Sequence, residues 1–278
     1  MVSFLLVIFA TSFGAGVVGS LAGLGGGVFL VPLLTVGFGL DIHYAVGASI
    51  VSVIATSSGA AAAYIRDRIT NLRIGMFLEL ATTTGAITGA LVAAYVNART
   101  LFLIFGIVLA LSALPLIRQI GEELPIGVRN DVWAARLRLS GTYPDRMLGS
   151  VPYQVTRVPV GLGMMWIAGV ISGLLGIGSG VFKVLAMDVG MRLPMKVSTT
   201  TSNFMIGVTA AASAGIYFGR GDVLPVIAAP VALGVLSGAA VGTRLLVRMR
   251  NKTLRQLFVP ILILISIEMI LRGFGVRT

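Results

Sequence analysis

A glycine-rich run interrupts an apolar stretch near the start of the chain, and the same run returns 153 residues later. The two copies read Gly23-Leu24-Gly25-Gly26-Gly27-Val28-Phe29 and Gly176-Ile177-Gly178-Ser179-Gly180-Val181-Phe182. Over positions 15 to 64, 17 of 50 residues are identical to those 153 positions later, without a gap. A constant register over this length predicts a duplicated unit. We divide the chain into a first repeat at 1–117, a linker loop at 118–158 and a second repeat at 159–278.

The composition places this duplicated chain in a membrane. Of 278 residues, 56% are hydrophobic and 11% are charged, whereas a soluble domain carries about 25% charged residues. A soluble core could not bury so much apolar sequence, so we expect an all-α polytopic membrane protein with the lipid bilayer as its main partner. The chain has no cysteine, which excludes disulfides and thiolate chemistry. Its net charge of +11 comes from basic residues in loops, where they orient a membrane protein, and we expect no nucleic-acid partner.

The glycine runs divide one apolar segment in each repeat into two limbs. The limbs and the other apolar stretches fall at 4–22, 27–38, 45–65, 74–95, 100–117, 160–175, 180–191, 196–218, 223–246 and 254–271. As a helix, residues 27–38 would cover only about 18 Å of a hydrocarbon core about 30 Å thick. We therefore predict that each broken segment is a re-entrant hairpin followed by three transmembrane helices. Three crossings are an odd number, so the second repeat would be inverted relative to the first.

The distribution of basic residues supports the hairpin interpretation. With hairpins, the loops at 66–73, 118–157, 192–196 and 244–255 share one face and hold 16 basic residues, against 4 on the other face. If each broken segment crossed once, the split would be 12 against 8. The positive-inside rule favours the first arrangement. Residues 118–158 would then lie in the cytoplasm, and both termini on the extracytoplasmic side of the inner (cytoplasmic) membrane. Residues 4–22 are long enough to cross alone, which leaves the alternative open.

Backbone freed by glycines at membrane depth must lie within protein or line a polar cavity. The helices that begin at Gly27 and Gly180 would point their N–H groups and positive dipole ends at the breaks, which favours a bound anion. Broken segments at matching places in two halves are typical of secondary transporters. We therefore assign substrate binding to Gly25, Gly26, Gly27, Gly178, Ser179 and Gly180. The alternative is that such glycines only allow close helix packing, as Gly85 with Gly89 and Gly238 with Gly242 would.

Side chains near the breaks strengthen the anion hypothesis. Lys183 lies inside an apolar limb where the first repeat has Leu30, and a lysine at membrane depth usually faces a cavity or a partner. The alternatives are pairing with Asp188 or extension to the membrane surface. The hydroxyl and amide groups of Ser49, Thr201, Ser202 and Asn203 begin the following span in each repeat and would hydrogen-bond an oxyanion.

Two acids inside apolar runs, Glu79 and Glu268, are candidates for proton coupling, although ion pairs with Arg73 and Arg272 are alternatives. His43, the sole histidine, is read as a loop residue. No cluster of residues has metal-ligand spacing, and we expect no cofactor. An intramembrane hydrolase using Ser179 would need His43, predicted on the opposite face, or Lys183 as its base. We therefore predict that the chain is not an enzyme.

The paired Gly-x-Gly-x-Gly segments resemble the TauE/SafE family of membrane transporters, the sulfite exporter or toluene sulfonate uptake permease family. Further matches are Val46-Gly47-Ala48-Ser49, Gly59 to Tyr64, Lys183-Val184 and Thr201-Ser202-Asn203-Phe204-Met205-Ile206-Gly207. The resemblance implies transport of sulfite, thiosulfate, sulfoacetate or other organosulfonates by alternating access. A passive anion channel is the alternative function. The oligomeric state is left open, with a homo-oligomer among the alternatives. The chain departs from the family pattern at Ser179, where a glycine is usual, and at Leu185, which replaces the proline matching Pro32.

Overall fold

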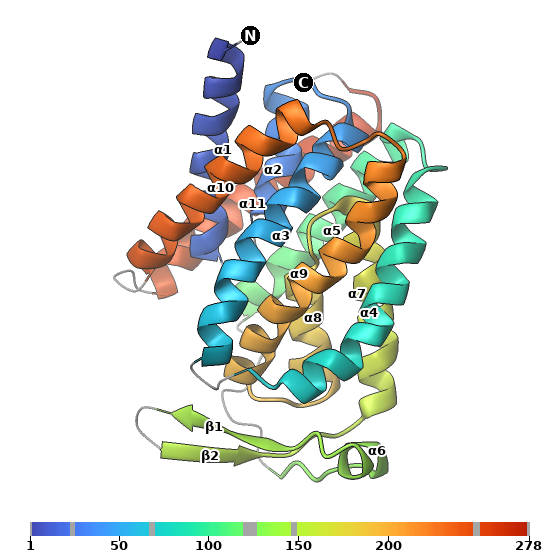
Figure 1. Ribbon diagram of the computed structural model, residues 1–278, viewed down its shortest axis with the longest axis vertical. Coiled ribbons are helices and arrows are strands. Elements are labelled where there is room, and N and C mark those ends of the chain that lie inside the picture. The colour runs from blue at the N-terminus through green and yellow to red at the C-terminus, as the bar shows by residue number, and fades with distance from the viewer. Residues whose placement is uncertain are drawn as a thin grey trace.

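A computed structural model describes residues 2–22, 26–66, 70–118, 127–145, 149–246 and 251–276 (Figure 1). The chain is mostly helical. Its elements are α1 (Val2–Ala22), α2 (Gly27–Pro32), the π-helical turn η1 (Leu33–Gly37), α3 (Ile42–Arg66), α4 (Leu72–Ala93), α5 (Ala98–Arg118), α6 (Val132–Arg136), β1 (Gly141–Asp145), β2 (Gly149–Tyr153), α7 (Val158–Leu175), α8 (Gly180–Leu185), the π-helical turn η2 (Ala186–Gly190), α9 (Met195–Gly219), α10 (Pro225–Leu246) and α11 (Asn251–Gly273). The predicted spans agree with these helices to within a few residues at each end.

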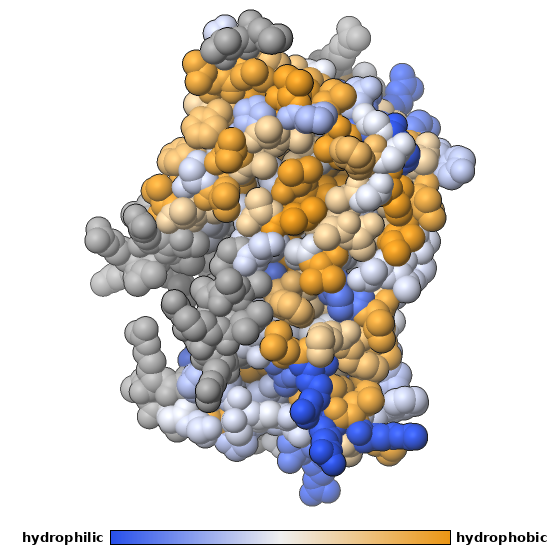
Figure 2. Space-filling view, viewed as in Figure 1, coloured by the Kyte–Doolittle hydropathy of each residue, from blue (hydrophilic) through white to orange (hydrophobic). Residues whose placement is uncertain are grey.

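Four helices in the described part of the chain are long and apolar enough to cross a membrane. They cover Ser3–Ser20, Leu72–Ala93, Val158–Leu175 and Pro225–Gly242, and shorter apolar helices lie at Gly27–Gly37, Ile42–Ser58 and Ala98–Leu114. Large apolar side chains such as Leu80 and Leu264, each 69% exposed, face outward. Figure 2 shows hydrophobic side chains over most of the height of one face, with the strongly hydrophilic side chains at the end where the β-strands lie and, in a smaller group, near the opposite end. Such a surface is suited to lipid, and the chain is a multi-pass membrane protein.

Each broken segment turns back on itself. In the first, the ring of Phe38 packs edge-on against that of Phe4, with centroids 5.9 Å apart. In the second, the N–H of Thr156 donates to the carbonyl of Met191 at 3.2 Å, and the Met191 side chain lies against Gly161. The end of each segment therefore lies beside its own beginning.

Both broken segments end in a π-helical turn, and the two turns lie 153 residues apart, like the glycine runs. Pro32 directly precedes the first turn, but Leu185 precedes the second and the turn is still present. The proline is therefore not the cause of the π geometry. Single π turns inside helices are often found at functional sites, and these two close the short limbs of the broken segments.

The linker is more ordered than the predicted loop. Helix α6 and an antiparallel hairpin of β1 and β2 lie within it, with Gly141 paired to Tyr153. An isolated two-stranded hairpin is only marginally stable in water. Here Tyr143 and Tyr153 are buried in an apolar cluster that also contains Ile74 and Met191, from α4 and the end of the second broken segment. The prediction of a loop throughout 118–158 is wrong for these elements, because packing against the helices stabilises them.

Candidate functional site

Lys183 lies at the centre of a buried polar chain. Its side chain is 0% exposed, and its ammonium donates a hydrogen bond of 2.5 Å to the hydroxyl of Thr209 on α9. The Thr209 hydroxyl in turn donates to Oε1 of Glu79 on α4, at 2.6 Å. One hydroxyl therefore bridges a buried cation and a buried carboxylate that lie 104 positions apart in the sequence.

Glu79 is held by hydroxyls. It is 7% exposed, and the Thr83 hydroxyl donates to the same Oε1 at 3.1 Å. Its other oxygen, Oε2, is buried and has no hydrogen-bond partner among the described residues. The suggested partner Arg73 instead donates to the carbonyl of Arg138, at 3.1 Å. The charge that faces Glu79 is therefore that of Lys183.

The two glycine breaks come together at Ser49. The Ser49 hydroxyl, on α3, donates to the carbonyl of Gly176 at 2.9 Å. A Cβ atom added to Gly27 would lie 2.8 Å from the Ser49 hydroxyl and 3.2 Å from the Gly176 carbonyl oxygen. Glycine at position 27 is therefore what allows the first break to approach the second this closely. Gly26 provides the N-cap position of α2, and Gly25 lies outside the described residues.

The second break is shaped by left-handed backbone. Gly176 and Gly178 have φ values of 66° and 74°, and Ser179, the N-cap residue of α8, has φ of 47°. An L-residue rarely adopts this conformation. The Ser179 hydroxyl is buried and has no hydrogen-bond partner within the described part of the chain. A strained residue with an unsatisfied hydroxyl at the start of a helix is a candidate for binding a solute.

The remaining candidates lie on α9. The Ser202 hydroxyl donates to the carbonyl of Gly180 at 3.1 Å, so Ser202 secures the start of α8. Thr201 accepts a hydrogen bond of 3.2 Å from the N–H of Asn71, and Asn203 is half-buried one residue past Ser202. The structure therefore brings Ser202 and Gly180 into direct contact, whereas Thr201 faces the end of the molecule where the linker docks.

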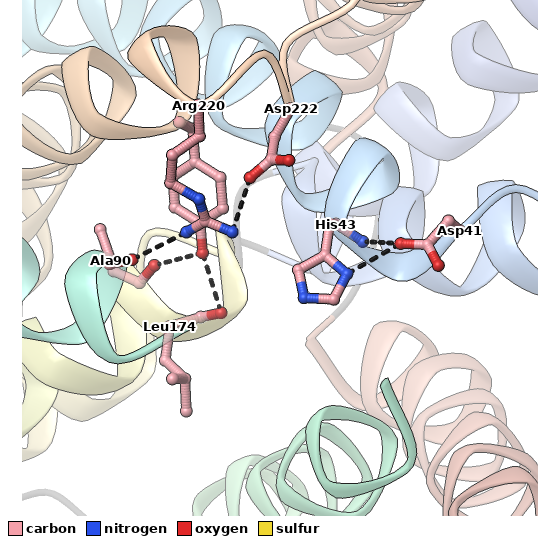
Figure 3. A network of polar contacts seen from close by, with 8 residues as sticks. Asp41, His43, Ala90, Leu174, Arg220 and Asp222 are labelled. Atoms are coloured by element: carbon pink, nitrogen blue, oxygen red, sulfur yellow. Dashed lines mark hydrogen bonds and ion pairs between the residues drawn. The ribbon is translucent and has the colours of Figure 1, made fainter. Parts of the chain in front are cut away.

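One end of the helix bundle is closed by a network around Arg220 (Figure 3). The Arg220 guanidinium donates to the carbonyl of Ala90 at 3.0 Å and pairs with Asp222 at 2.7 Å. The hydroxyl of Tyr217 donates to the carbonyls of Gly173 and Leu174, at 2.9 and 3.2 Å. These contacts join the end of α9 to the ends of α4 and α7.

The opposite end is closed by Asn71 and the linker. The Asn71 amide donates to the hydroxyl of Tyr153 at 2.6 Å and to the carbonyl of Leu139 at 3.0 Å. Its side-chain oxygen accepts from the N–H of Ile74 and so caps α4. Burial raises the pKa of the Tyr153 phenol, and the hydrogen bond with Asn71 lowers it in part. The described pockets lie at this linker surface, beside Tyr153 and Arg192, and on α11, so neither opens at Lys183.

Two other candidates lie away from Lys183. Glu268 on α11 pairs with Arg272 at 3.2 Å, and Arg272 also donates to the carbonyl of Thr35. His43, which we read as a loop residue, lies in the first turn of α3 and contacts Asp41 at 2.8 Å. No group of three or more His, Asp or Glu side chains that could bind a metal ion occurs among the residues that the structure describes.

Comparison with known proteins identifies the family of the chain. A family profile described as "Sulfite exporter TauE/SafE" matches residues 8–269. The chain belongs to the TauE/SafE family. It is 28% identical over 267 residues to the Bacillus subtilis "Probable membrane transporter protein YunE", covering 93% of this chain and 94% of that one. It is 27% identical over 240 residues to "Probable membrane transporter protein YdhB" of the same organism, covering 86% and 89%. No solved structure matches the chain.

The family establishes that this chain is a membrane transporter and not an enzyme, which removes the hydrolase hypothesis for Ser179. Sequence reasoning had not selected Thr209, the residue that joins Lys183 to Glu79 in this TauE/SafE protein. A signal was present, because Thr209 is identical to Thr56 in the internal alignment. Asn71 was also missed, since an asparagine in a loop does not reveal which segments it will join.

Proposed function

We propose that this TauE/SafE protein is a secondary transporter of small sulfur-containing anions such as sulfite, thiosulfate, sulfoacetate or other organosulfonates. The observation that carries the proposal is the fully buried Lys183 in the last turn of α8, the short helix that follows the second glycine break. A buried cation that shares its hydroxyl partner with a carboxylate is poised to exchange that carboxylate for an anionic solute. The family description names sulfite export, and the names of the two relatives specify membrane transport without a substrate.

Repeated contacts between helices support two structurally equivalent repeats. Gly85 on α4 packs against the carbonyl of Trp166 on α7, and Gly238 on α10 packs against the carbonyl of Phe13 on α1. Gly238 is the counterpart of Gly85, and Phe13 that of Trp166, at the same offset of 153 residues. Gly89 with Val170 and Gly242 with Val17 repeat the relation one turn further along. These glycines therefore also serve close packing, as the alternative interpretation of such pairs supposed.

The directions of equivalent helices support an inverted arrangement. Helix α3 meets its counterpart α9 with Gly47 near Asp222 and Ser57 near Gly207, so the two run antiparallel. Helix α5 meets its counterpart α11 with Leu103 near Gly273 and Gly106 near Ser266, again antiparallel. Antiparallel counterparts are what an inverted repeat requires. Because each broken segment ends beside its own start, three crossings follow it in either repeat.

The hydrogen bonds of the linker support the proposed orientation in the membrane. Arg73 and Asn71 contact the linker at Arg138 and Leu139, and Thr156 contacts Met191. Three of the four basic loops counted above therefore meet at one end of the bundle, and both termini lie toward the other end (Figure 1). By the positive-inside rule, the linker end is cytoplasmic and the termini are extracytoplasmic.

Closure at both ends favours a carrier over a channel. Lys183, Thr209 and Ser179 are at most 3% exposed, with the Arg220 network at one end of the bundle and the Asn71 contacts at the other. Among the residues that the structure describes, these contacts cover Lys183 from both ends, so in this proposal a solute reaches it when one end opens. A passive channel needs a continuous path, whereas alternating access opens one end at a time.

Counterflow in proteoliposomes tests the proposal. Vesicles loaded with unlabelled sulfite, thiosulfate, sulfoacetate or methanesulfonate should accelerate the entry of the same labelled anion, and chloride-loaded vesicles should not. Lys183→Leu, which installs the residue of the first repeat, should abolish this exchange, and Lys196→Met at the exposed start of α9 should preserve it. Entry that follows the membrane potential without acceleration by internal anion would indicate a channel. Exchange that persists in Lys183→Leu would remove Lys183 from the binding site.

A further inference from the structure

We infer that Glu79 and the transported anion compete for the single positive charge of Lys183, so that each monovalent anion crosses together with one proton. The inference rests on the proposed function and deepens it, because it defines both the charge of the substrate and the coupling ion.

The position of Glu79 makes its carboxylate a competitor for the charge of Lys183. Thr209 accepts from Lys183 at 2.5 Å and donates to Glu79 at 2.6 Å, so a single hydroxyl separates the carboxylate from the ammonium group. Oε2 of Glu79 is buried with no hydrogen-bond partner among the described residues. An unsatisfied carboxylate oxygen is costly to bury. A proton on Glu79 would relieve that cost and would turn the carboxyl group into a donor toward an anion.

The net charge of the buried groups decides whether an anion can bind without a proton. With Glu79 ionised, the buried pair has no net charge. An added monovalent anion would leave one uncompensated negative charge away from water, which is strongly unfavourable. If Glu79 takes up a proton, Lys183 and the anion neutralise each other instead. Anion and proton then bind together and cross together, and the net charge moved is zero. A divalent anion would leave one negative charge even with Glu79 protonated. Among the proposed substrates, the site therefore favours monovalent sulfonates and hydrogen sulfite over thiosulfate and sulfoacetate, which are divalent near neutral pH.

Other titratable groups on the elements around Glu79 could in principle face its carboxyl group. Helix α7 packs against α4 and contains no titratable side chain from Val158 to Leu175. Helix α9 contributes Lys196 in its first turn, about 20 Å along the helix from Thr209, and Tyr217 near its other end. On α4 itself, Arg73 is bound to the Arg138 carbonyl. Asp188 is buried on η2, but the charge that acts on Lys183 is that of Glu79, and the charge that acts on Glu79 is that of Lys183. Lys183 is thus the charged group that faces Glu79.

Reconstituted protein tests the coupling with labelled methanesulfonate, a monovalent anion whose charge does not change between about pH 5 and about pH 8. An inward proton gradient should concentrate the anion in the vesicles, approaching tenfold per pH unit for one-to-one coupling, and an imposed membrane potential should not. Glu79→Gln carries a permanently neutral side chain of the same shape. It should keep counterflow and lose accumulation driven by the proton gradient. Asp41 carries an exposed carboxylate on a loop, and the control variant Asp41→Asn should behave like the wild type.

A binding measurement provides a second readout that does not require transport. In the wild type, the dissociation constant for methanesulfonate should rise toward tenfold per pH unit on the alkaline side, because the anion must bind with a proton. In Glu79→Gln it should stay constant. Wild-type accumulation that follows potential and ignores the proton gradient would overturn the inference, as would a gradient response retained in Glu79→Gln. The inference would also be overturned if Glu268→Gln lost the accumulation driven by the proton gradient while Glu79→Gln kept it. If intact wild-type protein shows no counterflow of any sulfur anion, the proposed function itself fails, and this result is distinct from uncoupled counterflow.

Discussion

Removing the charge of Lys183 should destabilise the protein through Glu79, more than through the loss of the lysine itself. Lys183→Met retains most of the side-chain volume and removes the ammonium group. The carboxylate of Glu79, 7% exposed, would then be buried with no facing cation. It can escape only by taking a proton or by forcing the helices apart.

The cost follows from the first of these routes. A glutamate in water has a pKa of about 4.3, and each pH unit above that value costs about 1.4 kcal/mol to protonate it. At about pH 7.3 the variant should therefore lose about 4 kcal/mol, within the range of about 3–5 kcal/mol for removing one partner of a buried pair. This loss of stability should shrink as the pH falls, because protonating Glu79 then costs less free energy, and it should nearly vanish near about pH 4.3.

Equilibrium unfolding in mixed detergent micelles, followed by helical circular dichroism, measures this loss. The double variant Lys183→Met with Glu79→Gln removes both charges together and should recover most of the lost stability, a coupling energy that a double-mutant cycle isolates. Arg99→Met, at the exposed start of α5, should change stability by less than about 0.5 kcal/mol. A deficit in Lys183→Met that does not change with pH, or that persists in the double variant, would refute the idea that Glu79 carries it.

Two further predictions concern the packing of the scaffold. Gly173→Ala places a Cβ atom against the carbonyl of Ala86 and should lower the stability by about 1–3 kcal/mol. Gly163→Ala on the same helix meets nothing within 4 Å and should leave the stability unchanged. Thermal unfolding of the two variants tests this difference. Tyr153→Phe should loosen the linker by about 1 kcal/mol by removing the Asn71 contact. Burial raises the pKa of Tyr153 above its usual value of 10.0, so the docked linker is favoured at neutral pH and loses this contribution as the pH rises past that value. Hydrogen exchange of the linker should show an alkaline loosening in the wild type that Tyr153→Phe lacks.

Much of the scaffold was predictable because it depends on length and register. A limb of about 12 residues is too short to cross a bilayer, and this length alone predicted that residues 27–38 would not form an ordinary span. The structure places Phe38 beside Phe4 at the start of the same segment. The β-hairpin was not predictable in this way. Pro144 and Pro152 interrupt its strands and favour a loop interpretation, and its stability comes from Tyr143 and Tyr153 packing on distant helices.

The candidate site was only partly predictable, since its central pair joins residues 104 positions apart in sequence. Lys183 and Glu79 each stood out as a charge inside an apolar run, but the local sequence offered Asp188 and Arg73 as nearer partners. Helical spacing identifies neighbours on one helix and says nothing about which helix packs beside it. The contact of α4 with α9 decides the pairing, because it carries Glu79 to the Thr209 hydroxyl.

The charges of the site do not follow the symmetry of the proposed repeats. At the offset of 153 residues, Thr209 corresponds to Thr56, but Lys183 corresponds to Leu30 and Glu79 to Ala232. The hydroxyl is thus common to both repeats, whereas the buried cation and the buried carboxylate that it bridges each occur once. An exchange of conformation between inverted repeats can open the two ends of the bundle in turn, as alternating access requires. One cation and one carboxylate per chain then limit each cycle to one anion and one proton, however symmetric the helices around them are.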